Sequence, residues 1–188
     1  MKWQHFAEND TKEGVDGRWR YLSHDHLVIY IHGSNHIQDW KNNFRIRRFK
    51  LDDRVKVIRH DFQEAQWLHD YFEPIITKNI KHITIGGHSR GGAVGQVLYY
   101  LLKQTHDDLH IRGIFFASKR AGNIHFVRSI KDDCLHYKNK GDIVPALPPF
   151  PPLYSNLPVS RVGSFTFKFW DAHEPRSYFE LMSIYRLR

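Results

Sequence analysis

The sequence predicts an α/β fold in which helices cover both faces of a mostly parallel central sheet. Short apolar runs typical of buried strands alternate with amphipathic helical patterns, and a glycine-rich turn joins one such run to one such helix. The 188 residues suffice for one domain with a hydrophobic core and are too few for two. We therefore interpret residues 1–188 as a single domain.

Runs of apolar and β-branched residues predict the strands in chain order. The first strand is the continuous apolar run Leu27–Ile31. Similar short runs predict strands over Val55–Ile58, His82–Ile85, Ile114–Ala117 and Leu135–Asn139. Near the end of the chain, Phe165, Phe167 and Phe169 alternate with polar residues, which predicts a half-exposed strand.

Helical stripes separate these strands. One stripe consists of Phe62, Ala65, Leu68, Phe72 and Ile75, and Pro74 is expected to end or kink this helix. A second stripe, from Val94 to Leu102, has apolar residues at i, i+3, i+4, i+7 and i+8 and ends at the polar run 105–108. We expect a final helix over Glu174–Arg186 and a stiff, proline-rich loop over Pro145–Pro158.

The glycine-rich turn carries a serine in the pattern G-x-S-x-G, formed by Gly87, His88, Ser89, Arg90 and Gly91. A strand before it and a helix after it are typical of a nucleophile elbow, which lifts one serine hydroxyl out of the backbone. Glycines suit the crowded flanks of such a turn because a Cβ would clash there. The alternative is an ordinary turn whose serine merely caps the helix.

A serine hydroxyl becomes nucleophilic only beside a base, which in turn needs a carboxylate, and in such folds the chain order is serine, acid, histidine. Asp142 is the best acid candidate because it follows a predicted strand, where catalytic groups gather. Its alternative role is a turn residue that bonds its own backbone, and Asp171 is a rival acid. His173, expected on a short strand-to-helix loop, is the candidate base.

A serine that attacks a carbonyl group also needs hydrogen-bond donors for the oxyanion that forms. We expect one to be the backbone N–H of Arg90 and the other to come from Ser34, in the loop Ile31-His32-Gly33-Ser34 after the first strand. An ordinary strand-end turn is the alternative interpretation of that loop.

Together these segments resemble the class 3 lipases, the fungal-type triacylglycerol lipase group of the α/β-hydrolases. Residues 87–92 are similar to the G-H-S-x-G-G elbow of that family, and residues 141–149 to its acid loop, G-D-x-V-P-x-L-P-P. Residues 117–123 are similar to its A-P-R-V-G-N segment, with Lys119 where proline is usual. His173 followed by Tyr178 matches its C-terminal histidine and tyrosine-bearing helix.

The resemblance implies a carboxylester hydrolase without metal or organic cofactor. Its implied triad is Ser89, Asp142 and His173, and its implied oxyanion donors are Ser34 and Arg90. The segment 35–45 resembles a lid, with an apolar edge of Ile37, Trp40 and Phe44. An acyltransferase or thioesterase with the same triad is an alternative, as is a non-catalytic basic interaction module on the same scaffold.

The formal net charge of +8 is concentrated in a basic segment between residues 41 and 56, which includes Lys41, Arg45, Arg47 and Arg48. This segment suits the phosphates of an anionic lipid surface, or it forms a solvated face. Since no nucleic-acid motif accompanies it, nucleic acid is not an expected partner. With Arg90 expected near the site mouth, we hypothesise soluble esters or anionic lipids such as phospholipids as substrates.

Other features restrict the location and chemistry. The sequence has no apolar run of transmembrane length, its first fourteen residues do not resemble a signal peptide, and it has one cysteine, so we expect a cytoplasmic protein. His24-Asp25-His26 offers alternate metal ligands but lacks a defined third partner, and no metal site is expected.

Overall fold

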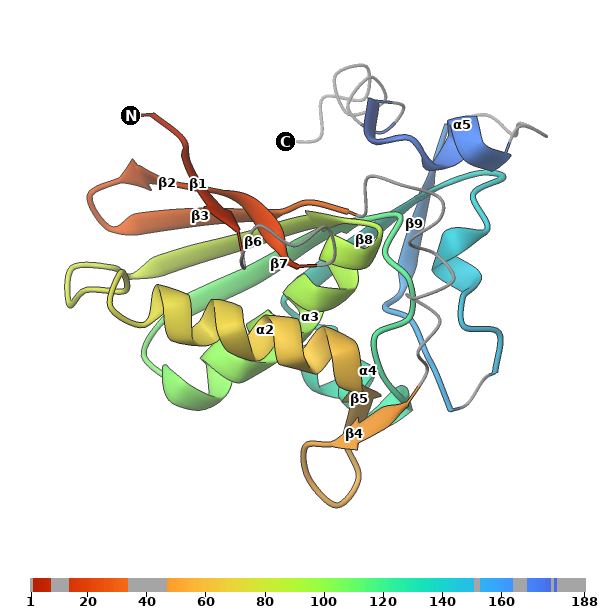
Figure 1. Cartoon of the computed structure of the whole chain (residues 1–188), viewed down its shortest axis with the longest axis horizontal. Helices are drawn as coiled ribbons and strands as arrows, with labels where there is room; N and C mark the ends of the chain where they lie inside the picture. Colours follow the sequence, from red (N-terminus) through yellow and green to blue (C-terminus); the bar gives the residue numbers. More distant parts are fainter. Residues whose placement is uncertain are drawn as a thin grey trace.

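A seven-stranded sheet in the order β1-β2-β3-β6-β7-β8-β9 forms the centre of the molecule (Figure 1). The computed structural model describes residues 2–7, 14–33, 47–150, 153–163, 169–176 and 178. β1 and β2 pair antiparallel at one edge, and β3, β6, β7, β8 and β9 run parallel. The strands are β1 (Gln4–Ala7), β2 (Asp16–Ser23), β3 (His26–Ile31), β6 (His82–His88), β7 (His110–Phe116), β8 (Cys134–Asn139) and β9 (Val159–Val162).

Most predicted strands are confirmed, with changed ends, but the run predicted as the first strand is β3, because β1 and β2 precede it. β6 continues three residues beyond the predicted Ile85 to His88, and β7 begins at His110 rather than Ile114. The strand predicted over Val55–Ile58 exists as β5 (Lys56–Ile58), but it pairs with β4 (Arg48–Lys50) in a separate two-stranded sheet. The apolar runs mark buried strands, but strand ends depend on backbone pairing with neighbours.

The strand predicted over Phe165–Phe169 is wrong at its end. Phe169 begins the helix α5 (Phe169–His173), and residues 164–168 lie outside the described residues, as does most of the predicted final helix. The last strand of the sheet is β9, whose side chains are exposed or half-buried. Such an edge strand has no buried face, so it carries no hydrophobic pattern that the sequence could reveal.

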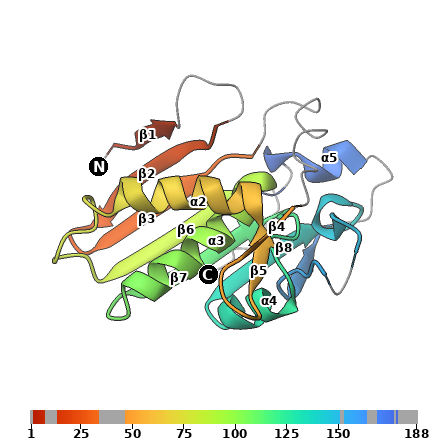
Figure 2. The ribbon, with the colours of Figure 1, turned by 60° about the horizontal axis from the view of Figure 1, so that its bottom comes forward.

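Three helices lie on one face of the sheet (Figure 2): α2 (Arg59–Phe72), α3 (Arg90–Thr105) and α4 (Ile124–Ile130). The predicted stripe on α2 buries Ala65, Leu68 and Phe72, and the helix ends two residues before Pro74. α3 lies directly on β6 and β7, and α2 packs against α3. The helix α3 is therefore enclosed between the sheet and α2, which explains why its whole first half is buried.

The core lies between this helical layer and the sheet. Leu27, Ile29 and Ile31 of β3 are fully buried, because alternate residues of a strand point to the same face. Their neighbours Val28 and Tyr30 point to the opposite face and are half-buried. On that face Tyr178 packs near the carboxyl ends of β7 and β8. Within the described residues, the expected helical cover is thus complete on one face and partial on the other.

Candidate active site

Ser89 lies in a tight turn between the last residue of β6 and the first of α3. Its φ of 56° is unusual for a residue with a side chain and marks a strained backbone. A Cβ on Gly91 would lie 2.2 Å from the His32 carbonyl oxygen, and one on Gly87 would lie 2.5 Å from the Gly91 oxygen. Both positions therefore require glycine. The Ser89 side chain makes no capping hydrogen bond to α3, so the helix-cap alternative is wrong.

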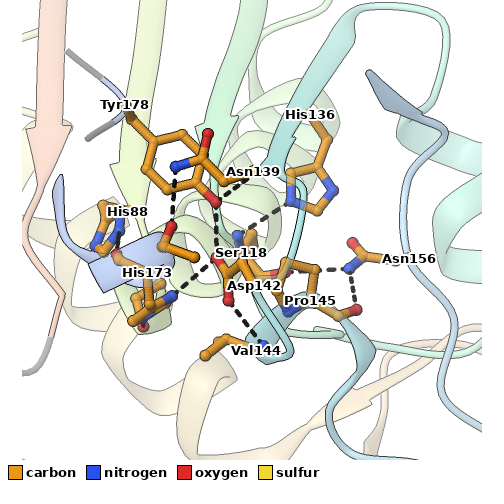
Figure 3. A network of polar contacts seen from close by, with 12 residues as sticks. His88, Ser118, His136, Asn139, Asp142, Val144, Pro145, Asn156, His173 and Tyr178 are labelled. Carbon is orange, nitrogen blue, oxygen red and sulfur yellow. Dashed lines mark hydrogen bonds and ion pairs between the residues drawn. The ribbon is translucent and has the colours of Figure 1, made fainter. Parts of the chain in front are cut away.

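Two hydrogen bonds join Ser89, His173 and Asp142 in a line. The Oγ of Ser89 lies 2.9 Å from Nε2 of His173. Nδ1 of the same ring lies 3.0 Å from Oδ2 of Asp142 (Figure 3). A carboxylate only accepts, so Nδ1–H donates to Asp142, and in that tautomer the Nε2 lone pair accepts from the Ser89 hydroxyl. Ser89 and His173 are 84 positions apart in the chain, and Asp142 and His173 are 31 apart. Their chain order is the serine, acid, histidine order that the sequence predicts.

The backbone places Asp142 and His173 from two different elements. Asp142 follows β8 in a turn after Gly141, whose φ is 96°. His173 is the last residue of α5 and does not lie on the strand-to-helix loop that we expected. The rival acid Asp171 is exposed on the same short helix, whereas Asp142 is 1% exposed and contacts His173.

Asp142 has further partners that hold its carboxylate in place. Oδ1 accepts the backbone N–H of Val144 at 2.9 Å, as the turn alternative requires. Oδ2 accepts both His173 and the hydroxyl of Tyr178, the latter at 2.6 Å. Burial raises the pKa of Tyr178, and the negative charge of Asp142 raises it further, so this hydroxyl stays protonated and donates. One carboxylate therefore serves both the local turn and the distant histidine.

Two more residues hold the α5 segment against the sheet. His88 Nε2 donates to the His173 carbonyl oxygen at 2.7 Å. Burial, and then the neighbouring His173 ring, lower the pKa of His88 to about 4, so it is neutral near pH 7. Asn139 Nδ2 donates to the Ala172 carbonyl oxygen at 2.9 Å. Sequence reasoning missed both roles, because neither residue belongs to a spacing pattern that would reveal its partner.

The prediction that Arg90 places a cation near the site mouth is wrong. Its side chain is 7% exposed and forms an ion pair with Glu64 of α2, which is 2% exposed. Nη2 also donates to the Gly14 carbonyl oxygen at 3.2 Å. One turn earlier on α2, Asp61 binds Nζ of Lys119 at 2.6 Å in a second buried pair. The guanidinium binds a buried carboxylate on another helix, and the elbow motif alone does not reveal that partner.

Of the expected oxyanion donors, the Arg90 N–H lies at the first residue of α3, where helix amides lack helical partners. Ser34 lies outside the described residues, as do Ile37, Trp40, Phe44, Lys41 and Arg45. The preceding Gly33 is close to the elbow, since a Cβ there would lie 3.1 Å from the Ser89 Cβ. Arg47 and Arg48, the first described residues of the basic segment, are exposed.

His24, Asp25 and His26 do not converge as ligands. The His24 side chain is exposed, and Nε2 of His26 lies 2.9 Å from Thr84 Oγ1. Within the described ranges, no cluster of three or more histidine, cysteine or acidic side chains suits a metal ion. Among the described helices, none has both the length and the apolar character to cross a membrane.

A family model described as lipase (class 3) matches residues 28–151, which is more than half of the chain. No curated protein sequence matches the chain. Similar solved structures include a lipase from Rhizopus microsporus var. chinensis, with 18% identity and a TM-score of 0.71 over 84% of this chain and 59% of that one. The MDLA N225Q mutant from Penicillium cyclopium has 17% identity and a TM-score of 0.72 over 87% and 64%.

The Rhizomucor miehei triacylglyceride lipase has 19% identity and a TM-score of 0.67, with 85% of this chain and 66% of that one covered. The chain thus spans about three fifths of the length of these solved structures. At these identities the structural likeness establishes a shared fold.

Proposed function

The chain belongs to the class 3 lipase family, and we propose on that premise that it is a serine hydrolase of carboxylic esters with Ser89, Asp142 and His173 as its triad. The observation that supports this proposal best is the continuous hydrogen-bonded line from the strained serine through the imidazole to the buried carboxylate. A serine that only shaped the turn would need neither partner.

In the proposed reaction, Ser89 Oγ attacks the ester carbonyl while His173 Nε2 takes its proton. The Asp142 carboxylate, held by Val144 and Tyr178, stabilises the imidazolium that forms. The N–H of Arg90, with a donor from Ser34, stabilises the oxyanion, and His173 then protonates the leaving alcohol. Water next attacks the acyl-enzyme with His173 again as base, which releases the acid and restores the serine.

Covalent labelling by a fluorophosphonate tests this proposal directly. We expect one adduct, mapped to Ser89 by peptide mass spectrometry, and none in Ser89→Ala. The matched control is Ser160→Ala, which removes an exposed serine hydroxyl on β9 and should leave the label in place. Hydrolysis of p-nitrophenyl butyrate should fall roughly 10⁴–10⁶-fold in kcat for Ser89→Ala. Labelling that persists in Ser89→Ala refutes the proposed nucleophile, and complete absence of label supports a non-catalytic module.

The proposed substrates are soluble esters or esters on an anionic lipid surface. Arg90 no longer supports this preference, so it depends on the basic segment, of which Arg47 and Arg48 are exposed. We expect faster hydrolysis on anionic than on neutral micelles at low salt, and loss of the difference at high salt because exposed charges are screened. The double variant Arg47→Gln/Arg48→Gln should reduce the preference. Equal rates on both micelles at every salt concentration contradict it.

A further inference from the structure

A second polar pocket lies at the opposite ends of the parallel strands from Ser89. Figure 1 shows the starts of β3, β6 and β7 at the opposite end of the sheet from α5. A cavity of about 240 Å³ opens there. Because the seven-residue strand β6 separates it from the elbow, the cavity is on the order of 20 Å from Ser89. It therefore takes no part in the proposed ester chemistry.

Three histidines form a row across this pocket. His26, His82 and His110 are direct register partners on adjacent strands, so their side chains share one face of the sheet. Ring centroids are 5.8 Å apart for His26 and His82, and 5.3 Å apart for the stacked pair His82 and His110. All three histidines line the pocket. The strand register thus concentrates protonatable nitrogens at one place on the surface.

A second row on the same face adds a guanidinium. Thr84 and Arg112 are register partners two residues further along the strands. Thr84 Oγ1 accepts from Arg112 Nε at 3.2 Å and lies 2.9 Å from His26 Nε2. The threonine hydroxyl therefore holds the arginine and one histidine beside each other at the pocket wall.

The hollow itself follows from the uneven start of the strands. β8 pairs with β7 only from Gly113 onward, so residues 110–112 have no strand partner on that side. Lys103 of α3 and Asp133 line the space that this leaves. Asp133 accepts the Tyr99 hydroxyl at 2.8 Å, which satisfies part of its hydrogen-bonding capacity. The pocket lining therefore contains two basic side chains, Lys103 and Arg112, and one carboxylate, that of Asp133.

We propose that this pocket binds a phosphate-like dianion, carried either by a small molecule or by a lipid head group. Arginine and lysine beside histidine donors suit oxyanion recognition, and the guanidinium repels a metal cation. The volume is below the 300–1,000 Å³ typical of drug-sized ligands, so a phosphate with a small substituent fits and an acyl chain does not. Burial lowers the pKa of His26 most, and the charges of Arg112 and His82 lower it further.

Mild acid should strengthen this site. The groups that face the histidine row are Asp25 before β3, Arg112 on β7, Lys103 on α3 and Asp133 before β8. Protonation of a histidine adds a positive charge and a second N–H donor, so acid favours anion binding in this pocket.

Sulfate is a suitable first probe, because it remains a dianion between pH 5.5 and pH 8 and any pH dependence then belongs to the protein. We measure its Kd by calorimetry, with chloride at matched ionic strength as the reference. We expect sulfate to bind at least roughly tenfold more tightly at pH 6 than at pH 8, and Arg112→Gln to weaken it by at least about tenfold. Arg128→Gln on α4 and His24→Gln, both at exposed positions, are the matched controls and should bind as the parent does.

His110→Gln provides a second variant that keeps the test informative if Arg112→Gln folds poorly, and Ser89→Ala should bind sulfate normally. Binding that is independent of pH, or unchanged in both pocket variants, overturns the proposal whatever the esterase assays show. Glycerol 3-phosphate and vesicles of phosphatidic acid in phosphatidylcholine then distinguish the sources. Competition by glycerol 3-phosphate supports a small-molecule ligand. Vesicle binding that Arg112→Gln abolishes supports a lipid head group. Failure of both to displace sulfate overturns the proposal.

Discussion

Replacement of Arg90 by methionine tests the role of its side chain alone, because the backbone N–H remains. The guanidinium and the Glu64 carboxylate are both buried, so Arg90→Met removes the guanidinium from a carboxylate that stays in the interior. Loss of one member of such a pair costs about 3–5 kcal/mol of unfolding free energy. For a domain of this size each kcal/mol lowers Tm by about 2–4 °C. We therefore expect Arg90→Met to be folded at room temperature and clearly less stable than the parent.

Urea unfolding followed by circular dichroism measures this cost, and a double variant identifies its origin. Arg90→Met/Glu64→Leu removes both charges, so its stability should return to within about 1–2 kcal/mol of the parent. The exposed Arg128→Met is the matched control and should change stability little. The ratio of rates on anionic and neutral ester micelles should stay the same in Arg90→Met. A stable Arg90→Met that loses a preference for anionic micelles refutes the buried-pair account.

Three further outcomes are expected. Asp142→Asn should lower kcat roughly 10³–10⁴-fold while Asp171→Asn leaves it near the parent value, and the reverse result would move the acid to Asp171. Tyr178→Phe removes a hydrogen bond to a buried carboxylate and should cost about 1.5–3 kcal/mol in urea unfolding; an unchanged midpoint contradicts that role. Burial lowers the pKa of His136 to about 4, below its unfolded value. The folded state therefore loses free energy of unfolding as pH falls from about 6.5 toward 4, by up to about 1.4 kcal/mol per pH unit. His136→Gln should therefore flatten the pH dependence of unfolding, whereas His24→Gln should not.

The nucleophile elbow was predictable because its determinants are local. A β-rich run, glycines at Gly87 and Gly91 and a helical stripe after them describe one continuous segment. The clashes that require those glycines involve the turn itself and the adjoining strand β3. Asp142 was also accessible from sequence, because Gly141 and the following proline-rich loop mark a turn at a strand end.

Other features depended on contacts between distant segments. The sequence indicated His173 as the partner of Ser89, but it did not indicate the α5 helix that carries this residue, because the preceding sequence alternates like a strand. The direction of the Arg90 side chain depends on Glu64, which lies on another helix. β9 lacks an alternating hydrophobic pattern because this edge strand buries neither of its faces.

The sequence by itself determined the α/β class, the elbow at Ser89 and the chain order of the three polar residues, because hydrophobic period and turn chemistry act over a few neighbouring residues. Only the tertiary structure decided which charges are buried and which rings are adjacent. The burial of Arg90 and the row of His26, His82 and His110 depend on helix packing and strand register, which bring together residues that no local pattern relates.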